Sequence, residues 1–587
     1  MNRGIEADSA RAWIAAAAPP DMAASLGASV GEWAEGNLPV FALWRFLGRR
    51  LGSAGLLDPA RDAARRAVAA ADGDPLPLAE LARLDFAAGD DTAARALAER
   101  VPAGHPSRLD ARLLLAEMSD RPDTGLAAEI AGLLHARPDW GDAHELWHRL
   151  LRRHGLEDAA GFLMGWMKAC GAGPTPLMHM AQILLEGGHA DQAAPILANL
   201  WRANEDSLGP VIGRHHAAIP PDPAAEADLR HRIEAAQALP EDGLPIHPLP
   251  TPPSRLPERV LYVGPDQTGT SPSFPNDLAQ HLGDAARAAG GSMAHYADPA
   301  ITGPDRPRMT DAARAGRIAA FIDHLRRTRP QVVILDCCWS PMRGDIDPAA
   351  LAAVKAETGL SLLCLFRDAQ EPSISLIRHW AALADGLILP DPFSPVFDAA
   401  NADLAAKALV IPIPAPFGPE PPPQPRHGLL FIGGLGQFHR PILVGALTET
   451  GIDFTAILGT RRRELAPDLA AYAALLADSR AVLNIAVHHR DQRLITGRVW
   501  ETIAAGGLLL EQTGSATPRF FQPYRHYLPW SDMADIVHAC RMLAANDDLR
   551  RTIIASARDW SARHYAPARV WGALMALSGH DGTGIPA

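Results

Sequence analysis

A glycine followed five positions later by an alanine recurs at a nearly constant interval through the first third of the chain. The pairs are Gly55/Ala60, Gly89/Ala94, Gly155/Ala160 and Gly188/Ala193. Pro122/Ala127 fills the gap between the second and third pairs, so successive pairs start 33 or 34 residues apart. A fixed period of this length indicates a helical repeat array, in which each helix pair must stack on its neighbours to bury its apolar stripe.

Within each period the glycine suits the end of a first helix, and the alanine suits a point where two helices pack closely. Acidic residues stand in the turn between them, at Asp90, Asp158 and Asp191. This pattern resembles the tetratricopeptide repeat, although most of that family's Trp and Tyr positions are absent. We predict about five stacked helix pairs with a concave face. An irregular helical domain without a partner is the alternative.

Two proline-dense stretches divide the rest of the chain. Prolines crowd residues 238–257 and again 412–425, and because proline fixes an extended backbone, both stretches predict semi-rigid linkers. The predicted domains are a repeat domain (1–237), a linker (238–257), a first sheet domain (258–415), a second linker (416–427) and a second sheet domain (428–587).

Apolar strands alternate with helical stretches after the first proline run. Expected strands cover 259–264, 331–336, 361–366, 385–389 and 408–411, and helices are expected at 276–288, 309–327 and 372–383. Continuous apolar strands separated by helices are typical of a parallel, doubly wound sheet. A second series, with strands at 428–433, 454–458, 479–486 and 508–510, follows the second run. The predicted fold class is therefore a helical repeat solenoid followed by two Rossmann-like sheets.

The stretch 498–510 reads as an amphipathic helix that runs into a buried strand. Arg498 and Glu501 lie three residues apart on one helical face, and Gly506 and Gly507 end the helix. Asn484 ends the expected strand before it. The carboxyl ends of parallel strands share one edge of the sheet, where open α/β sheets bind ligands. We therefore expect Asn484, Arg498 and Glu501 to converge on one crevice.

These residues carry a resemblance to a known family. The run Leu483-Asn484-Ile485, the pattern Arg498-x-x-Glu501-x-x-Ala504-x-Gly506-Gly507 and the later Phe520-Phe521 resemble the C-terminal domain of the spore-maturation-protein-like group of glycosyltransferases. The resemblance implies a two-domain GT-B enzyme that uses a nucleotide-activated sugar. It also implies that Glu501 binds the ribose hydroxyls of the donor, that Arg498 lies near its phosphates, and that Gly506 and Gly507 belong to the donor site.

One position departs from the wider group. Its paired-glutamate signature needs a glutamate at position 493, where this chain has Arg493, which puts in doubt any retaining mechanism that uses that first glutamate. Arg498 and Glu501 could instead be a surface ion pair, which would stabilise the helix by only about 0.3–0.5 kcal/mol.

A glycine-rich turn opens the second sheet. Gly434, Gly436, His439 and Arg440 lie between an expected strand and the next helix. Exposed backbone N–H groups at such a turn bind phosphate, and the helix dipole favours the anion, so Gly434, Gly436 and Arg440 are candidate donor contacts. A tight turn that needs glycine for its backbone alone is the alternative.

The candidate catalytic groups are Asp336, Asp368 and His439. Asp336 ends an expected strand of the first sheet, and Asp368 lies just beyond another. In a GT-B enzyme that sheet faces the acceptor, so its strand-end loops would carry a general base. Either aspartate could equally cap the helix that follows it.

The charge and composition of the chain limit the kinds of partner that it can bind. The net charge of -12 and pI near 6.0 argue against nucleic acid and anionic membranes, which attract basic surfaces. The five cysteines have no metal-ligand spacing. We expect no bound metal or cofactor, no transmembrane segment and no signal peptide, and hence a cytoplasmic protein.

Together these features predict a metal-independent glycosyltransferase that moves a sugar from a nucleotide-diphosphate-sugar donor to a protein or glycan presented by the repeats. Arg498, Arg440 and helix N-termini would stabilise the departing diphosphate. Two other functions remain open: a non-catalytic scaffold with a degenerate GT-B half, and a GT-B nucleotide-sugar epimerase.

Overall fold

The computed structural model describes residues 3–36, 38–53, 56–119, 124–136, 141–153, 159–170, 174–213, 219–268, 274–275, 277–298, 308–337, 346–367, 373–434, 439–458, 464–489 and 492–579. The chain divides into two compact units. Unit 1 comprises Met1–Pro176 and Arg306–Ala319, and unit 2 comprises Leu177–Asp305 and Ala320–Ala587. Predicted Gly436 and Asp368 lie outside the described residues.

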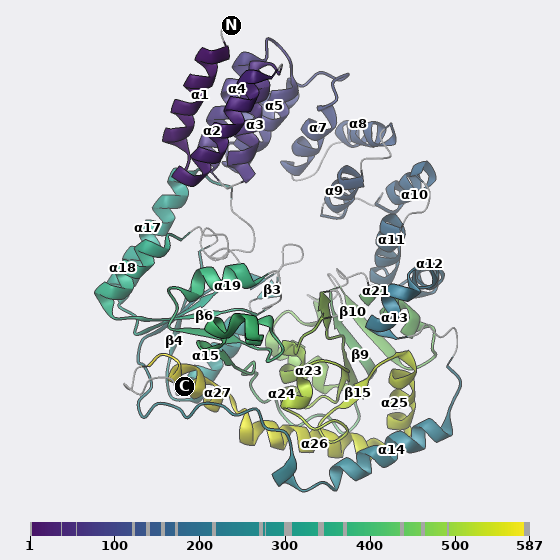
Figure 1. Ribbon diagram of the computed structural model, residues 1–587. Helices are drawn as coiled ribbons and strands as arrows, with labels where there is room; N and C mark the ends of the chain where they lie inside the picture. The colour runs from purple at the N-terminus through teal and green to yellow at the C-terminus, as the bar shows by residue number, and fades with distance from the viewer. Residues whose placement is uncertain are drawn as a thin grey trace. The chain divides into compact units, whose positions relative to one another are not determined.

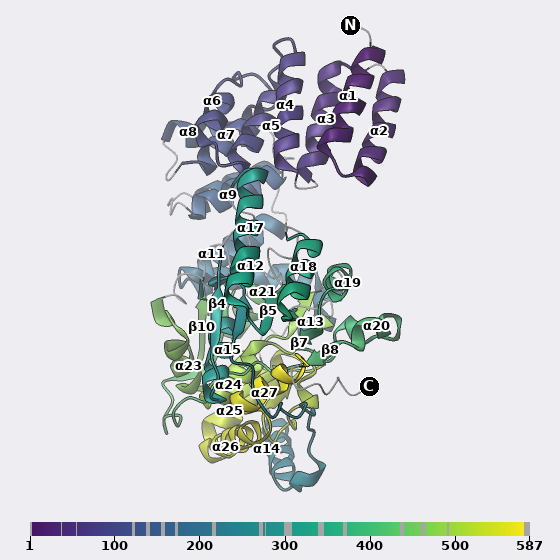
Figure 2. The ribbon, with the colours of Figure 1, turned by 90° about the vertical axis from the view of Figure 1, so that its left-hand side faces the viewer.

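Unit 1 is built from helices that pack side by side (Figure 2). They are α1 (Arg3–Ala17), α2 (Pro20–Glu35), α3 (Val40–Ser53), α4 (Leu57–Ala70), α5 (Leu76–Ala87), α6 (Asp91–Glu99), α7 (Arg108–Glu117), α8 (Thr124–His135), α9 (Gly141–Arg153) and α10 (Ala159–Cys170). The pairs α3/α4, α5/α6, α7/α8 and α9/α10 follow the predicted period, and α11 (Pro174–Glu186) with α12 (Ala190–Ala203) makes the fifth. The helical repeat architecture is thus confirmed.

The structure explains why glycine and alanine recur in each repeat, and the reasons are the predicted ones. Gly89 and Gly188 have φ angles of +83° and +80°, a left-handed conformation that disfavours other residues. Ala60, Ala94 and Ala193 are fully buried, so their small side chains let the paired helices approach closely. The period therefore reflects backbone geometry at the end of the first helix and packing at the start of the second.

A segment from the middle of the sequence also belongs to unit 1. The start of α17 (Asp311–Thr328) meets the start of α4 through reciprocal hydrogen bonds. The N–H of Asp58 donates to Asp311 over 2.8 Å, and the N–H of Asp311 donates to Asp58 over 3.1 Å. The guanidinium of Arg308 lies 4.2 Å from the centre of the Phe86 ring. Nothing in the repeat period predicts this contact, because it joins residues about 250 positions apart.

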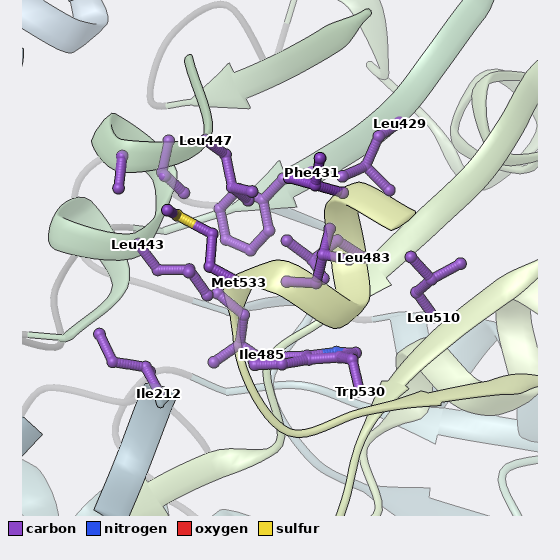
Figure 3. Packing of buried hydrophobic residues seen from close by; sticks show 14 of the residues in the cluster. Ile212, Leu429, Phe431, Leu443, Leu447, Leu483, Ile485, Leu510, Trp530 and Met533 are labelled. Atoms are coloured by element: carbon purple, nitrogen blue, oxygen red, sulfur yellow. The ribbon is translucent and has the colours of Figure 1, made fainter. Parts of the chain in front are cut away.

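Helices α12, α13 (Glu205–Ile212) and α14 (Pro223–Gln237) belong to unit 2. Leu197 and Trp201 of α12 share one buried cluster with Ile442 and Leu443 of the second sheet domain, and Ile212 of α13 lies in the same cluster (Figure 3). The boundary between the two compact units therefore lies at residue 176, whereas the sequence predicted that the repeat domain ends at 237. The difference arises because these helices pack on the sheet domain.

The first sheet has six parallel strands in the order β4-β1-β5-β6-β7-β8. They are β1 (Val260–Val263), β4 (Met293–Tyr296), β5 (Val332–Asp336), β6 (Ser361–Leu365), β7 (Gly386–Leu389) and β8 (Ala408–Val410). The connecting helices include α15 (Asp277–Ala288), α17, α18 (Pro348–Thr358), α19 (Ile374–Ala381) and α20 (Ala402–Ala405). Five strands match the predicted ones. Edge strand β4 was missed because its residues are half-buried or exposed and lack an apolar run.

The second sheet has five parallel strands in the order β10-β9-β11-β14-β15. They are β9 (His427–Gly433), β10 (Phe454–Leu458), β11 (Ser479–Asn484), β14 (Leu509–Gln512) and β15 (Leu528–Trp530). Its helices are α21 (His439–Thr448), α23 (Leu469–Ala477), α24 (Gly497–Ala505), α25 (Met533–Ala545) and α26 (Asp547–His564). The last helix, α27 (Pro567–Ala576), packs on α15 of the first sheet domain. Figure 1 shows both sheets with their helices. The prediction of two Rossmann-like sheets is confirmed.

Both proline-dense stretches belong to unit 2 and are held by its C-terminal part. Arg563 pairs with Glu241, the Tyr565 hydroxyl accepts a 2.9 Å hydrogen bond from the N–H of His247, and Leu244 is buried. In the second stretch, the N–H of Gly418 donates to the carbonyl of Ala504. Proline supplies the extended backbone, and these contacts fasten it to the C-terminal helices. Among the described helices, none is long and apolar enough to cross a bilayer.

Candidate functional site

A cavity of about 190 Å³ lies at the carboxyl edge of the second sheet. Gly433 ends β9 and Asn484 ends β11, so both strands deliver their last residues to this cavity. The first turns of α21 and α24 add further lining residues. The lining residues are Asp277, Phe431, Ile432, Gly433, Arg440, Tyr472, Asn484, Ile485, Thr496, Gly497, Arg498 and Glu501. Four predicted site residues, Arg440, Asn484, Arg498 and Glu501, therefore meet in one place.

The Glu501 side chain is held from two neighbouring helices and is only 10% exposed. His281 of α15 lies 3.3 Å from Oε1, and the Tyr472 hydroxyl of α23 donates a 3.0 Å hydrogen bond to Oε2. Burial alone would raise the pKa of Glu501, but the hydrogen bond and charge of His281, the charge of Arg498 and the Tyr472 hydrogen bond outweigh it. The pKa of the carboxyl is held below its usual range, so it is ionised at neutral pH.

Arg498 is fixed beside this carboxylate. Its Nη2 donates a 2.5 Å hydrogen bond to the carbonyl of Ile432 at the end of β9, and its guanidinium lies 5.5 Å from the centre of the Tyr472 ring. Its Nε is buried and has no hydrogen-bond partner among the described residues. The arginine is therefore oriented by the sheet. The alternative of an exposed surface pair with Glu501 does not fit a carboxylate this deeply buried.

Asn484 forms part of the rigid wall. Its Nδ2 donates a 2.6 Å hydrogen bond to Glu511, and its Oδ1 accepts a 3.1 Å hydrogen bond from the Thr496 hydroxyl. The Trp530 indole N–H donates to its backbone carbonyl. Both ends of its amide are engaged, so Asn484 fixes the strand end and the start of α24 relative to each other.

Two residues from the first sheet domain reach the site, and neither was among the predicted ones. Asp277 lines the cavity with a side chain 43% exposed, and its carboxylate lies 3.6 Å from Arg367. His281, one helical turn further along α15, is 4% exposed. One feature of the sequence could have indicated Asp277. It lies at the start of the helix that follows strand β1, and a helix that follows a parallel strand begins at the ligand-binding edge of the sheet.

Other predicted residues lie away from the cavity lining. Gly506 has a φ of +85° and is the left-handed C-cap of α24. A Cβ on Gly507 would lie 2.8 Å from the carbonyl oxygen of Leu476. Both glycines stand at the end of α24 remote from Arg498, about 12 Å along the helix at 1.5 Å per residue. Their prediction as donor contacts needs correction, because backbone conformation and close packing explain them.

Asp336 is fully buried in the first sheet. It accepts a 2.5 Å hydrogen bond from the Tyr262 hydroxyl and a 2.6 Å bond from Arg367. These surroundings favour a structural role over a general base, which would need access to an acceptor. His439 is 8% exposed at the start of α21 and Gly434 is exposed just after β9. His439 precedes the lining residue Arg440, and Gly434 follows the lining residue Gly433, but neither lines the cavity itself.

Arg493, which replaces the first signature glutamate, lies on β13 (Gln492–Arg493), outside the lining. A Cβ on Gly514 would lie 2.9 Å from its Cδ, so the arginine packs tightly against that turn. Two Asp-x-Asp spacings occur in the chain, at 72/74 and 345/347. Asp74 accepts from the N–H of Leu76 and Asp347 caps α18. In the part of the chain that the structure describes, no three His, Cys, Asp or Glu side chains gather as a metal site.

Comparison with known proteins finds similarity to one family model over part of the second sheet domain. Residues 440–576 match a family model described as "Glycosyl transferase-like". No curated protein matches the chain. Several solved structures are similar to parts of this chain. HepE of Anabaena in complex with UDP-glucose is 12% identical, with 54% of this chain and 98% of that chain covered and a TM-score of 0.37.

An O-GlcNAc transferase of Thermobaculum terrenum is 12% identical, with 86% and 98% covered and a TM-score of 0.36. Sucrose-phosphate synthase of Thermosynechococcus elongatus is 13% identical, with 55% and 98% covered and a TM-score of 0.38. The matched segment 440–576 contains Arg440, Asn484, Arg498 and Glu501. Most residues that line the cavity thus lie in the segment that is similar to the glycosyltransferase-like family.

Proposed function

We propose that the cavity binds a nucleotide-diphosphate sugar and that the protein transfers the sugar to an acceptor hydroxyl. The observation that supports this most is the ionised, buried Glu501 beside two arginines at the carboxyl edge of a parallel sheet. A carboxylate can accept hydrogen bonds at about four lone-pair positions. His281 and Tyr472 use one on each oxygen, which leaves one on each for the two ribose hydroxyls.

The diphosphate would lie against Arg498, Arg440 and the N-terminus of α21. In the transfer, the bond between the anomeric carbon and the diphosphate oxygen breaks, and a bond from the acceptor oxygen to that carbon forms. The bonding electrons leave with the diphosphate, so negative charge develops there. Two guanidinium groups and a helix N-terminus are suited to stabilise it. Arg498 is already oriented by Ile432, which avoids a reorganisation cost during the reaction.

The acceptor hydroxyl loses its proton during the transfer, and a carboxylate that lines the cavity can accept it. Asp277 is the lining residue that comes from the first sheet domain, and its carboxylate is partly exposed. We assign it the role of general base, in preference to the fully buried Asp336. The contact with Arg367 would orient the Asp277 carboxylate toward the acceptor.

The helical repeats would present a macromolecular acceptor, a protein or a glycan. Stacked helix pairs form an extended surface, and holding a large acceptor near the cavity raises its effective concentration. We also propose a cytoplasmic location. Cys364 and Cys540 are free thiols, as expected in a reducing compartment.

The test is a binding screen followed by a transfer assay. UDP, GDP, ADP, CDP and dTDP are titrated into the full chain by calorimetry, and the sugar derivatives of the tightest binder are then assayed for hydrolysis and transfer. We expect one diphosphate to bind and its sugar derivative to be consumed. Binding without any turnover would favour a non-catalytic scaffold, and no binding by any of the five would reject the donor site.

A further inference from the structure

His281 connects the two sheet domains beside the cavity, through its contact with the lining residue Glu501. It projects from α15 of the first domain and meets Glu501 on α24 of the second, with Nε2 3.3 Å from Oε1. Both side chains are almost inaccessible, at 5% and 10% exposure. The contact joins residues 220 positions apart, so it exists only when the two domains are packed together.

The direction of this hydrogen bond is determined by chemistry. An ionised carboxylate carries no proton, so Nε2 of His281 must be the donor. Burial alone would lower the pKa of His281, but the hydrogen bond and charge of Glu501, with the charges of Asp277 and Asp284, raise it overall. The histidine therefore donates to Glu501 whether its ring is neutral or protonated.

Stability does not explain a histidine at this position. Its second nitrogen, Nδ1, is buried and has no hydrogen-bond partner in the described part of the chain. A buried polar atom without a partner is costly, and a leucine of similar size would fill the space between α15 and α24 without that cost. A leucine, however, cannot donate a hydrogen bond to Oε1 of Glu501.

We propose that His281 is a positioning residue for nucleotide binding: it holds the Glu501 carboxylate ionised and oriented, so that its free lone pairs meet the ribose hydroxyls. This inference rests on the proposed function of the cavity. It adds that the first sheet domain, which contributes little to the cavity wall, sets the affinity for the nucleotide through this single hydrogen bond. Tyr472 orients Oε2 from within the second domain, and His281 orients Oε1 from outside it.

The experiment measures nucleoside diphosphate affinity in the full-length chain, with the tightest binder of the five as probe. His281→Leu removes the donor, and His281→Asn keeps an amide that is too short to reach Glu501. We expect both to lose about tenfold in affinity, the size of one hydrogen bond to a charged group. The side-chain amide of glutamine extends about as far as Nε2 of histidine, so His281→Gln should keep most of the wild-type affinity. His526→Leu is the matched control, because His526 is also buried but contacts Gln522 and Trp560 and not Glu501.

A double-mutant cycle separates positioning from general packing. In a Glu501→Gln background there is no carboxylate to hold, so His281→Leu should cause little further loss of affinity. The melting temperature of each variant checks that it is folded. Equal affinities for wild type, His281→Leu and His281→Asn would overturn the inference, as would losses that simply add in the cycle. If wild type binds none of the five diphosphates, the proposed function fails and the inference fails with it.

Discussion

The side-chain amide of Asn484 donates a 2.6 Å hydrogen bond to Oε2 of Glu511, its register partner on the neighbouring strand. The other oxygen of Glu511 accepts from the hydroxyls of Ser515 and Thr517. Burial raises the pKa of Glu511 to about 7, although these three hydrogen bonds oppose the shift. The wall of the cavity is thus anchored to a buried carboxyl group that titrates near neutral pH.

This carboxyl predicts a pH-dependent stability. Because the folded pKa lies above the ordinary value of 4.5, the folded state binds more protons than the unfolded state between these two values. The free energy of unfolding therefore falls as pH rises from about 4.5 to 7 and levels off above. Glu511→Gln lacks this titration, so its stability relative to wild type should rise over that range by on the order of 1–3 kcal/mol. Parallel melting-temperature profiles of the two proteins would contradict the raised pKa.

Arg498→Lys should behave like Arg498→Ala in nucleoside diphosphate binding. Lysine keeps the charge but lacks the planar fork that can bond the Ile432 carbonyl and a phosphate oxygen together. Calorimetric titration measures the three affinities, with Arg551→Lys on the exposed part of α26 as the control. A lysine variant with wild-type affinity would mean that Arg498 acts only as a point charge.

Truncation tests where the sheet unit begins. A fragment of residues 177–587 keeps α12, α13 and α14 on the second sheet domain, so we expect it to be folded and to bind the nucleotide. A fragment of residues 258–587 exposes the apolar surface of α21 that Leu197 and Trp201 cover, and we expect it to aggregate. Size-exclusion chromatography and calorimetry compare the two. If the two fragments are equally soluble and bind the nucleotide equally well, the sheet unit begins at the first proline-dense stretch, as the sequence alone suggests.

Asp277→Asn should lower the rate of sugar transfer while leaving nucleotide affinity nearly unchanged. General-base catalysis typically contributes about 10²–10⁴-fold, so kcat should fall by that order. Asp284→Asn, on the same helix and paired with Arg287, is the control and should transfer normally. An unchanged kcat in Asp277→Asn would remove this aspartate from the chemistry.

Local patterns in the sequence predicted the fold well. The repeat period, the apolar strands and the glycine that ends α24 each follow from local backbone geometry or from burial on both faces of a sheet. Convergence of Asn484, Arg498 and Glu501 followed from the rule that parallel strands end at one edge. Their roles in binding a donor stay predictions.

Long-range packing was the part that could not be predicted. His281 and Glu501 meet across 220 residues, and no pattern within α15 marks its histidine. The burial of Asp336 depends on Tyr262 and Arg367 from other segments. The composition of the proline-dense stretches excludes helices and therefore predicts linkers. Their packing within unit 2 depends on contacts with Tyr565 and other C-terminal residues. Gly506 and Gly507 were correctly placed at a helix end, and only the contacts show that this end is remote from the cavity.

The central claim is that Glu501 binds the ribose of a nucleotide in this cavity. The most direct measurement is the dissociation constant of the tightest-binding nucleoside diphosphate for wild type, Glu501→Ala and the control Asp548→Ala, whose carboxylate is 93% exposed on α26. A hydrogen bond to a charged group is worth about 1.5–3 kcal/mol, so Glu501→Ala should weaken binding about ten- to a hundredfold with the fold intact, and Asp548→Ala should not weaken it. Unchanged affinity in a folded Glu501→Ala protein would contradict the account.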